Sequence, residues 1–222
     1  MSTPHAPSPP RGIDHVVVAS PRLAALAEAW RRLGFQVGPR NGHPWGTENH
    51  IIQFDGAFIE LIGVADGAAI PPPAPRRFSF GAFVRDFIAG GEGAAMLALE
   101  SRNAIADAEA FRLARIGDFE PFFFERQGVD AAGQPVRVSF TLAFAEPQEL
   151  SRVGFFTCQQ HQPQNFWSKS QQIHANGVES IHSVVFVCDD PSDYHEFLGH
   201  FIGQREMRAT SFGLELDTGR GM

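Results

Sequence analysis

The sequence has few of the features that mark a secreted or membrane protein. It contains only two cysteines in 222 residues, Cys158 and Cys188, and no signal-peptide-like apolar segment follows its start. A disulfide scaffold is therefore not expected, and we predict a reducing, cytoplasmic location. No apolar run approaches the ~20 residues that a transmembrane helix needs, so we expect no membrane partner.

Clustered basic charge is also missing. The 18 Lys and Arg residues are scattered and are outnumbered by 25 Asp and Glu, which gives a formal charge of −7. Because binding to nucleic acid needs cations gathered against phosphates, we expect no nucleic-acid partner. The sequence has no glycine-rich phosphate loop, serine nucleophile elbow or paired zinc-finger cysteines. With 43% hydrophobic residues, the composition is that of a globular chain.

A β-α-β-β-β pattern occupies residues 11–66, after a Pro-rich segment at residues 1–10 that we expect to be a disordered tail. An apolar strand at residues 12–20 is followed by helical spacing of apolar residues from Pro21 to Gly34. Asp55-Gly56 is a strong hairpin signal. Three short strands complete the predicted module, at residues 35–37, 49–54 and 57–64.

The pattern recurs in degenerate form. A Pro-rich connector at residues 67–91 leads to a second module at residues 92–166, whose residues 93–101 align with residues 12–20 without a gap. Asn103 is placed to cap its helix. In this alignment Met96 takes the position of His15. We expect the equivalent of Glu60 to be one of two adjacent residues, Thr157 or Cys158.

A partial third module is predicted at residues 177–222. It has a first strand at residues 178–187, a helix after Pro191 and two short strands at 204–210 and 213–216. An unpaired module of this kind would leave a sheet edge exposed, which favours a homo-oligomer.

Histidines stand in two of the three predicted first strands. His15 lies where a uniformly buried strand would carry another Val, and His182 recurs at the start of the third module. This recurrence indicates a shared metal or catalytic centre. The alternative is that both are strand histidines hydrogen-bonded in a polar cavity, with Glu60 facing solvent.

Four segments carry a family resemblance. They are the Gly-Ile-Asp-His-Val-Val run at residues 12–17, the helix end at 33–35, the loop at 43–49 and the strand at 58–62. These segments resemble the vicinal oxygen chelate superfamily, which includes glyoxalase I, extradiol dioxygenases and fosfomycin-resistance proteins. The glyoxalase-like domain proteins are the most similar.

The resemblance implies an α+β fold, in which repeated β-α-β-β-β modules form curved mixed sheets around a cleft. It also implies a metal-dependent enzyme that acts on a small organic substrate. A divalent metal (Zn, Fe, Mn or Ni) would be held by His15 and Glu60, with His182 as the third ligand. Met96 departs from the family pattern because it removes a ligand from the second module.

The reaction type stays open at this point. Lyase or isomerase chemistry would need a base beside the chelated substrate, whereas dioxygenation would need iron and a position for oxygen. The loop residues His43, Trp45 and Asn49 are candidates for substrate binding, although turn formation alone also explains this loop. The alternative function is a metal-free protein that sequesters an apolar ligand in the same cleft. The 21 phenylalanines of the chain favour an apolar interior.

Overall fold

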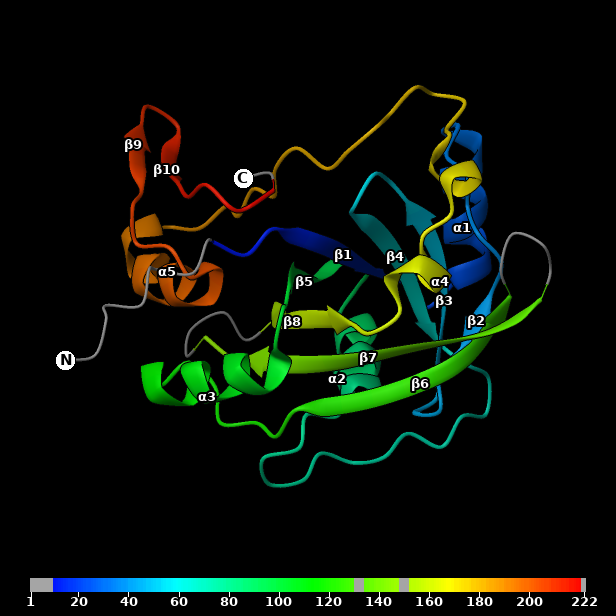
Figure 1. Cartoon of the computed structure of the whole chain (residues 1–222), viewed down its shortest axis with the longest axis horizontal. Helices are drawn as coiled ribbons and strands as arrows, with labels where there is room; N and C mark the ends of the chain where they lie inside the picture. Colours follow the sequence, from blue (N-terminus) through cyan, green and yellow to red (C-terminus); the bar gives the residue numbers. More distant parts are fainter. Residues whose placement is uncertain (1–9, 130–133, 148–151, 221–222) are drawn as a thin grey trace.

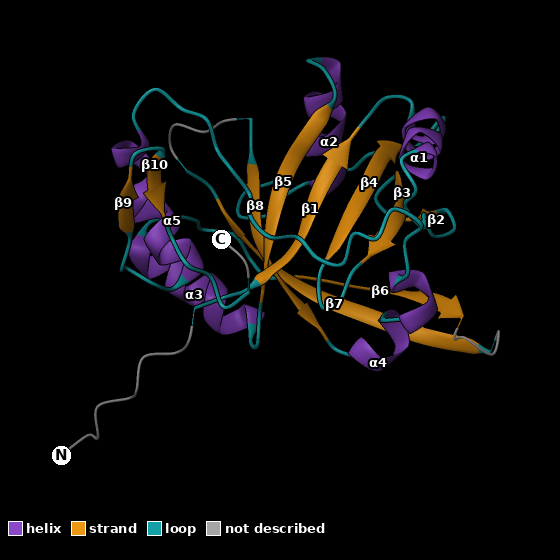
Figure 2. Ribbon diagram, turned by 90° about the horizontal axis from the view of Figure 1, so that it is seen from above, coloured by secondary structure: helices purple, strands orange, loops and turns teal. Residues whose placement is uncertain are grey.

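The computed structural model describes residues 10–129, 134–147 and 152–220, so residues 1–9 of the predicted tail lie outside the described part. Its centre is one eight-stranded mixed sheet with the strand order β2-β3-β4-β1-β5-β8-β7-β6. The sheet curls strongly, which brings β6 at one edge toward β2 at the other (Figures 1 and 2). This architecture confirms the predicted α+β class.

The first module has five elements: β1 (Ile13–Ala19), α1 (Leu23–Arg32), β2 (Asn41–Gly42), β3 (Thr47–Gln53) and β4 (Phe58–Val64). Helix α1 buries Leu23 and Ala27 against the outer face of the sheet. It ends before Gly34, whose φ of 88° is a left-handed conformation that glycine adopts without strain. The turn at Asp55-Gly56 joins β3 and β4 as predicted.

The second module repeats this order with β5 (Gly93–Glu100), α3 (Ala104–Ala114), β6 (Phe122–Val129), β7 (Pro135–Ala145) and β8 (Gly154–Gln160). The side chain of Asn103 accepts a hydrogen bond of 3.1 Å from the Ala106 amide and caps α3 as predicted. The two β-α-β-β-β modules of the fold class are therefore both formed.

The two modules pair through their first strands, and the pairing shows which residues are equivalent. In the antiparallel ladder of β1 and β5, His15 lies opposite Ala98 and Val17 lies opposite Met96. If each residue of β1 is matched with the residue 81 positions later in β5, His15 matches Met96 and Val17 matches Ala98. The pair of His15 with Ala98 then corresponds to the pair of Met96 with Val17. The predicted equivalence of Met96 with His15 is therefore confirmed.

The last strands have a different offset. β1 pairs with β4, and β5 with β8, both in parallel. Phe58 lies opposite His15, and Gly154 lies opposite Met96, the equivalent of His15. Phe58 therefore matches Gly154, an offset of 96 residues. Two positions further along, Glu60 matches Phe156. The longer β6–β7 hairpin of the second module causes most of this change in offset, and its longer β7–β8 connection causes the rest. The expectation that Thr157 or Cys158 is the equivalent of Glu60 was therefore wrong.

Three elements differ from the prediction. Residues 35–37 form no strand, because the Phe35 amide bonds back to the Trp30 carbonyl at the end of α1, and the edge strand is the later β2. Helix α2 (Phe80–Ala89) lies within the predicted connector, where the preceding prolines obscured it. Strand β6 was missed because its three consecutive phenylalanines hide the alternation of a half-buried strand.

The chain after β8 adds six short elements: α4 (Pro163–Phe166), η1 (Lys169–Gln172), η2 (Pro191–Tyr194), α5 (His195–Ile202), β9 (Arg208–Thr210) and β10 (Gly213–Glu215). Strands β9 and β10 form a separate two-stranded sheet, close to their predicted positions. Among the described residues, every helix is too short or too polar to span a bilayer.

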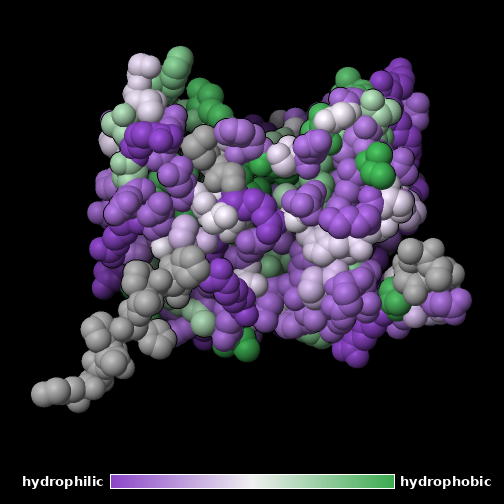
Figure 3. All heavy atoms as spheres, turned by 45° about the horizontal axis from the view of Figure 1, so that its top comes forward, coloured by the Kyte–Doolittle hydropathy of each residue, from purple (hydrophilic) through white to green (hydrophobic). Residues whose placement is uncertain are grey.

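The predicted strand at residues 178–187 is not formed. This segment crosses from η1 to α5 (Figure 1), and its side chains Ile181, Val184 and Phe186 pack on the outer apolar face of the sheet. Val185, between Val184 and Phe186, and Val187, after Phe186, are exposed. Hydrophobic atoms also show in the hollow between the two raised ends of the surface (Figure 3). A ladder cannot form here because β1 and β5 already have a strand on each side.

Apolar side chains cover both faces of the sheet. On the outer face, Leu97 and Phe155 pack against α3 and α5. On the inner face, Val17, Met96 and Phe156 pack against α2, which lies in the concave side of the curl. The inner face is where β1, β4 and β8 present side chains to a common interior.

The cap of α3 provides a test of the second module. Replacing Asn103 by Ala should lower the free energy of unfolding by about 1 kcal/mol, because the Ala106 amide loses its acceptor. Asn103→Asp keeps an acceptor and should change stability much less. Urea unfolding of the three proteins measures the difference, and equal losses in both variants would contradict the cap.

Candidate functional site

The concave side of the sheet holds a half-open cavity of about 50 Å³. His15 from β1 and Glu60 from β4 both line it, which confirms the prediction that they project into a common cavity. Side chains from the second module close the other side. The polar side chains of the lining are His15, His43, Asn49, Glu60 and Arg126.

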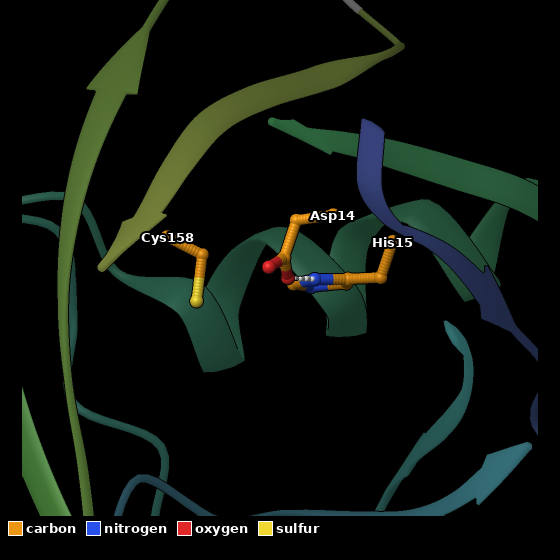
Figure 4. Close-up of side chains that lie close together, drawn as sticks. All are labelled: Asp14, His15 and Cys158. Carbon is orange, nitrogen blue, oxygen red and sulfur yellow. Dashed lines mark hydrogen bonds and ion pairs between the residues drawn. The ribbon is translucent and has the colours of Figure 1, made fainter. Parts of the chain in front are cut away.

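A β-bulge places Asp14 beside His15. Between Ile13 and His15 the β1–β5 ladder shifts register by one residue, so Asp14 is an extra residue in β1. Ile13 packs on the outer face and His15 points inward, although residues two apart in a regular strand share one face. Asp14 and His15 point toward each other (Figure 4), with 2.5 Å between Asp14 Oδ1 and His15 Nδ1.

This contact defines the free atom of the His15 ring. Nδ1 donates to the buried Asp14 carboxylate, so in the neutral ring Nε2 carries the lone pair. The other oxygen of Asp14 accepts from Gln160 Nε2 at 2.9 Å. The ring also stacks on Phe58 with 4.1 Å between centroids. His15 Nε2 is thus fixed in direction, 3.9 Å from Glu60 Oε2.

The second oxygen of Glu60 faces a second histidine. His43 Nε2 lies 3.9 Å from Glu60 Oε1, and the Asn49 amide nitrogen lies beside both atoms, donating to Oε1 and 3.3 Å from Nε2. Because Nε2 accepts from this amide, Nδ1 of the neutral ring donates to the Thr47 hydroxyl at 2.8 Å. The ring stacks on Trp45, 4.6 Å between centroids.

Burial lowers the pKa of His43 from its usual value. Glu60 opposes this effect, and the positive charge of Arg126 adds to it. The net lowering means that His43 is neutral near neutral pH, and its Nε2 lone pair accepts from the Asn49 amide. All three predicted loop residues, His43, Trp45 and Asn49, therefore lie at the cavity, and their contact with a substrate stays a prediction.

The structure does not bring His182 to this site. It lies on the segment between η1 and α5, is exposed, and does not line the cavity. The expectation that it faces His15 relied on a third first strand that reaches the cleft, and that strand is not formed. His43, which lies in the turn before β3, faces Glu60 instead.

Two residues of the site were not singled out from the sequence. Asp14 adjoins His15 in the sequence, but strand alternation would place it on the opposite face, and only the bulge reverses this. Arg126 lies on β6, a strand that the sequence did not reveal, and reaches the cavity because the sheet curls back on itself. An arginine directly after a run of phenylalanines was the available signal.

Cys158 lies close to the Asp14–His15 pair (Figure 4). Among the described residues, these three form a group whose candidate ligand atoms all lie within 4.8 Å of one another. Burial, with the nearby Asp14 and Glu60 carboxylates, raises the pKa of the Cys158 thiol well above its usual range. A neutral thiol is a poor ligand, and Asp14 already accepts hydrogen bonds at both oxygens, so this group fits a metal less well than the Glu60 side of His15.

Each histidine beside Glu60 fits a divalent metal shared with that carboxylate. Two ligand atoms at roughly 2.0–2.2 Å from one ion lie at most about 4.4 Å apart. Both histidine–carboxylate separations, 3.9 Å, fall inside that limit, but they involve different oxygens of Glu60, and His15, His43 and Glu60 do not form a group whose ligand atoms all lie within 4.8 Å of one another. Each ring is also oriented through Nδ1, His15 by a carboxylate and His43 by a hydroxyl, as metal-binding imidazoles are.

Comparison with known proteins identifies the family. The sequence matches the model of the glyoxalase-like domain over residues 13–201. The chain belongs to this glyoxalase-like domain family and thus to the vicinal oxygen chelate superfamily. A search of curated proteins gives no match.

Several solved structures align with the chain. A hypothetical protein from Staphylococcus aureus aligns with a TM-score of 0.64 at 16% identity, over 93% of this chain and 79% of that one. A methylmalonyl-CoA epimerase variant from Streptomyces coelicolor gives 0.44 at 20% identity, over 69% and 99%. A 4-hydroxymandelate synthase variant from Streptomyces coelicolor gives 0.41 at 13%, over 77% and 54%. The likeness to the Staphylococcus aureus protein supports the fold and leaves the substrate open.

The lowered pKa of His43 predicts a pH dependence of stability in protein freed of metal with EDTA. As pH falls below about 6.5, the unfolded chain binds the proton before the folded chain does, so the free energy of unfolding decreases. His43→Gln removes this contribution and should flatten the loss. Urea unfolding at about pH 7.5 and about pH 5.5 gives the comparison. An equal loss in the parent protein and the variant would show that His43 is not responsible.

Proposed function

We propose that the protein is a metal-dependent enzyme of the vicinal oxygen chelate type that acts on a small organic substrate. The observation that carries the proposal is the orientation of His15, whose free Nε2 faces the free oxygen of Glu60 while Asp14 fixes Nδ1. A histidine held by a buried carboxylate and aimed at a second carboxylate is typical of a metal ligand.

His43 is the third ligand in this proposal, in the role first assigned to His182, and binding one ion together with His15 would draw the two rings closer. Its Nε2 lies 3.9 Å from Glu60 Oε1, and the Asn49 amide donates its hydrogens into the gap between them. A donor between two lone pairs fills the place that a cation would take. Two imidazoles and a carboxylate suit Zn, Fe, Mn or Ni and leave positions for substrate oxygens.

When bound, the ion would polarise the substrate oxygens as a Lewis acid. The chain itself supplies orientation and a dry environment: Asp14 fixes the direction of His15, Asn49 that of Glu60, and the phenylalanine walls exclude water. A lyase or isomerase would also need a proton acceptor at the substrate. We leave the choice between that class and a dioxygenase to the identity of the metal.

A metal-free binding protein is the second candidate, because both equivalent positions of the second module are apolar. Met96 replaces His15 and Phe156 replaces Glu60. Half of the interior that holds donors in the first module is therefore hydrocarbon in the second, which suits an apolar ligand.

Elemental analysis of protein purified without chelators separates the two candidates. We expect near-stoichiometric metal in the parent protein, and affinity weaker by about tenfold or more in His15→Ala, His43→Ala and Glu60→Gln. His182→Ala is the matched control, since it removes an exposed imidazole outside the cavity and should retain the metal. A parent protein without metal would exclude the enzyme proposal and favour the binding protein.

A further inference from the structure

Arg126 brings a positive charge into the cavity without a close anionic partner. It projects from β6 into the lining that also contains His43 and Glu60. Within the described part of the chain, its guanidinium makes a single hydrogen bond, to Asn41 Oδ1 at 3.4 Å, and no ion pair within 4.0 Å. Burial lowers the pKa of Arg126, with Glu60 opposing the effect.

Such an arrangement is costly unless a ligand uses it. A guanidinium has five N–H donors, and a part-buried one normally has an anion or several acceptors beside it. Glu60 does not serve as that anion, because its Oε1 accepts from Asn49 and its Oε2 faces His15. Most donors of Arg126 are therefore left for something else that enters the cavity.

The surroundings of Arg126 restrict what that ligand is. Phe124 stacks on Phe140 with 5.0 Å between ring centroids, and Phe166 lies against Phe140 at 5.7 Å. All three rings line the cavity beside Arg126. A ligand here therefore combines an anionic end with an apolar body, and a cavity of about 50 Å³ requires that body to be short.

We propose that the substrate is a short-chain carboxylate whose carboxylate group is held by Arg126, while its apolar carbons lie against the phenylalanines. A planar guanidinium matches a carboxylate through two parallel hydrogen bonds, which gives orientation as well as affinity. The inference rests on the proposed function in one respect, that this cavity is the substrate site. Arg126 thereby becomes the residue that selects acids over neutral analogues.

The test compares propionate with propionamide, which has nearly the same shape and no charge. Both are titrated by calorimetry or ligand-observed NMR into EDTA-treated protein and again after Zn²⁺ is added. The parent protein should prefer propionate by about tenfold in at least one of these forms. Arg126→Met should lose this preference, and Arg126→Lys should keep part of it.

Arg137→Met is the matched control, because Arg137 on the neighbouring β7 is exposed and pairs with Glu125 outside the cavity. It should bind propionate as the parent protein does. No preference for propionate in either form, or a preference that Arg126→Met leaves intact, would overturn the inference. Because metal content is measured separately, a parent protein that lacks metal as purified without chelators but prefers propionate would refute the metal proposal and leave the role of Arg126 standing.

Discussion

The antiparallel ladder between β1 and β5 is the constraint on which the site depends. It joins the two modules, and its extra residues set which side chains point inward. Asp14 is the extra residue of β1, and Ala95 takes the equivalent place in β5. A regular β1 would turn Asp14 away from His15 into the outer apolar cluster, where a carboxylate without a partner is costly. The bulge instead joins it to His15 and so defines the free nitrogen of that ring.

The two modules share one backbone plan and have different interiors. In the first, the inner positions of β1 and β4 carry His15 and Glu60; in the second, the equivalents are Met96 and Phe156. This division explains why these inner positions carry polar groups on one side of the cavity and hydrocarbon on the other, where Arg126 of β6 is the charged exception. Hydrogen bonds and ion pairs strengthen next to such an apolar wall, because water does not compete for the same groups. The apolar side chains of the second module thus strengthen the hydrogen bonds and ion pairs of the first.

Much of the fold could be predicted from the sequence, because its signals are local. The strand with His15, the cap at Asn103 and the first-strand repeat that equates Met96 with His15 all depend on short stretches of chain. Glu60 was assigned the wrong equivalents because the hairpins between the strands differ in length, which no local pattern reveals. His182 was misplaced for a related reason. Its segment has the composition of a strand, but a strand also needs an unpaired neighbour, and the central strands have none to offer.

The residues that closed the site were those brought together by the curl of the sheet. His43 and Asn49 come from one edge and Arg126 from the other, more than 75 residues away in sequence, and they meet through Asn41. A chain of side chains runs from Arg126 through Asn41 and Asn49 to Glu60, so a cation and an anion share one network without touching. Each charge is only partly compensated by this chain of neutral amides. The remaining uncompensated charge is positive at Arg126 and negative at Glu60. The anionic end of a ligand would neutralise Arg126, and a cation held by Glu60 would neutralise that carboxylate.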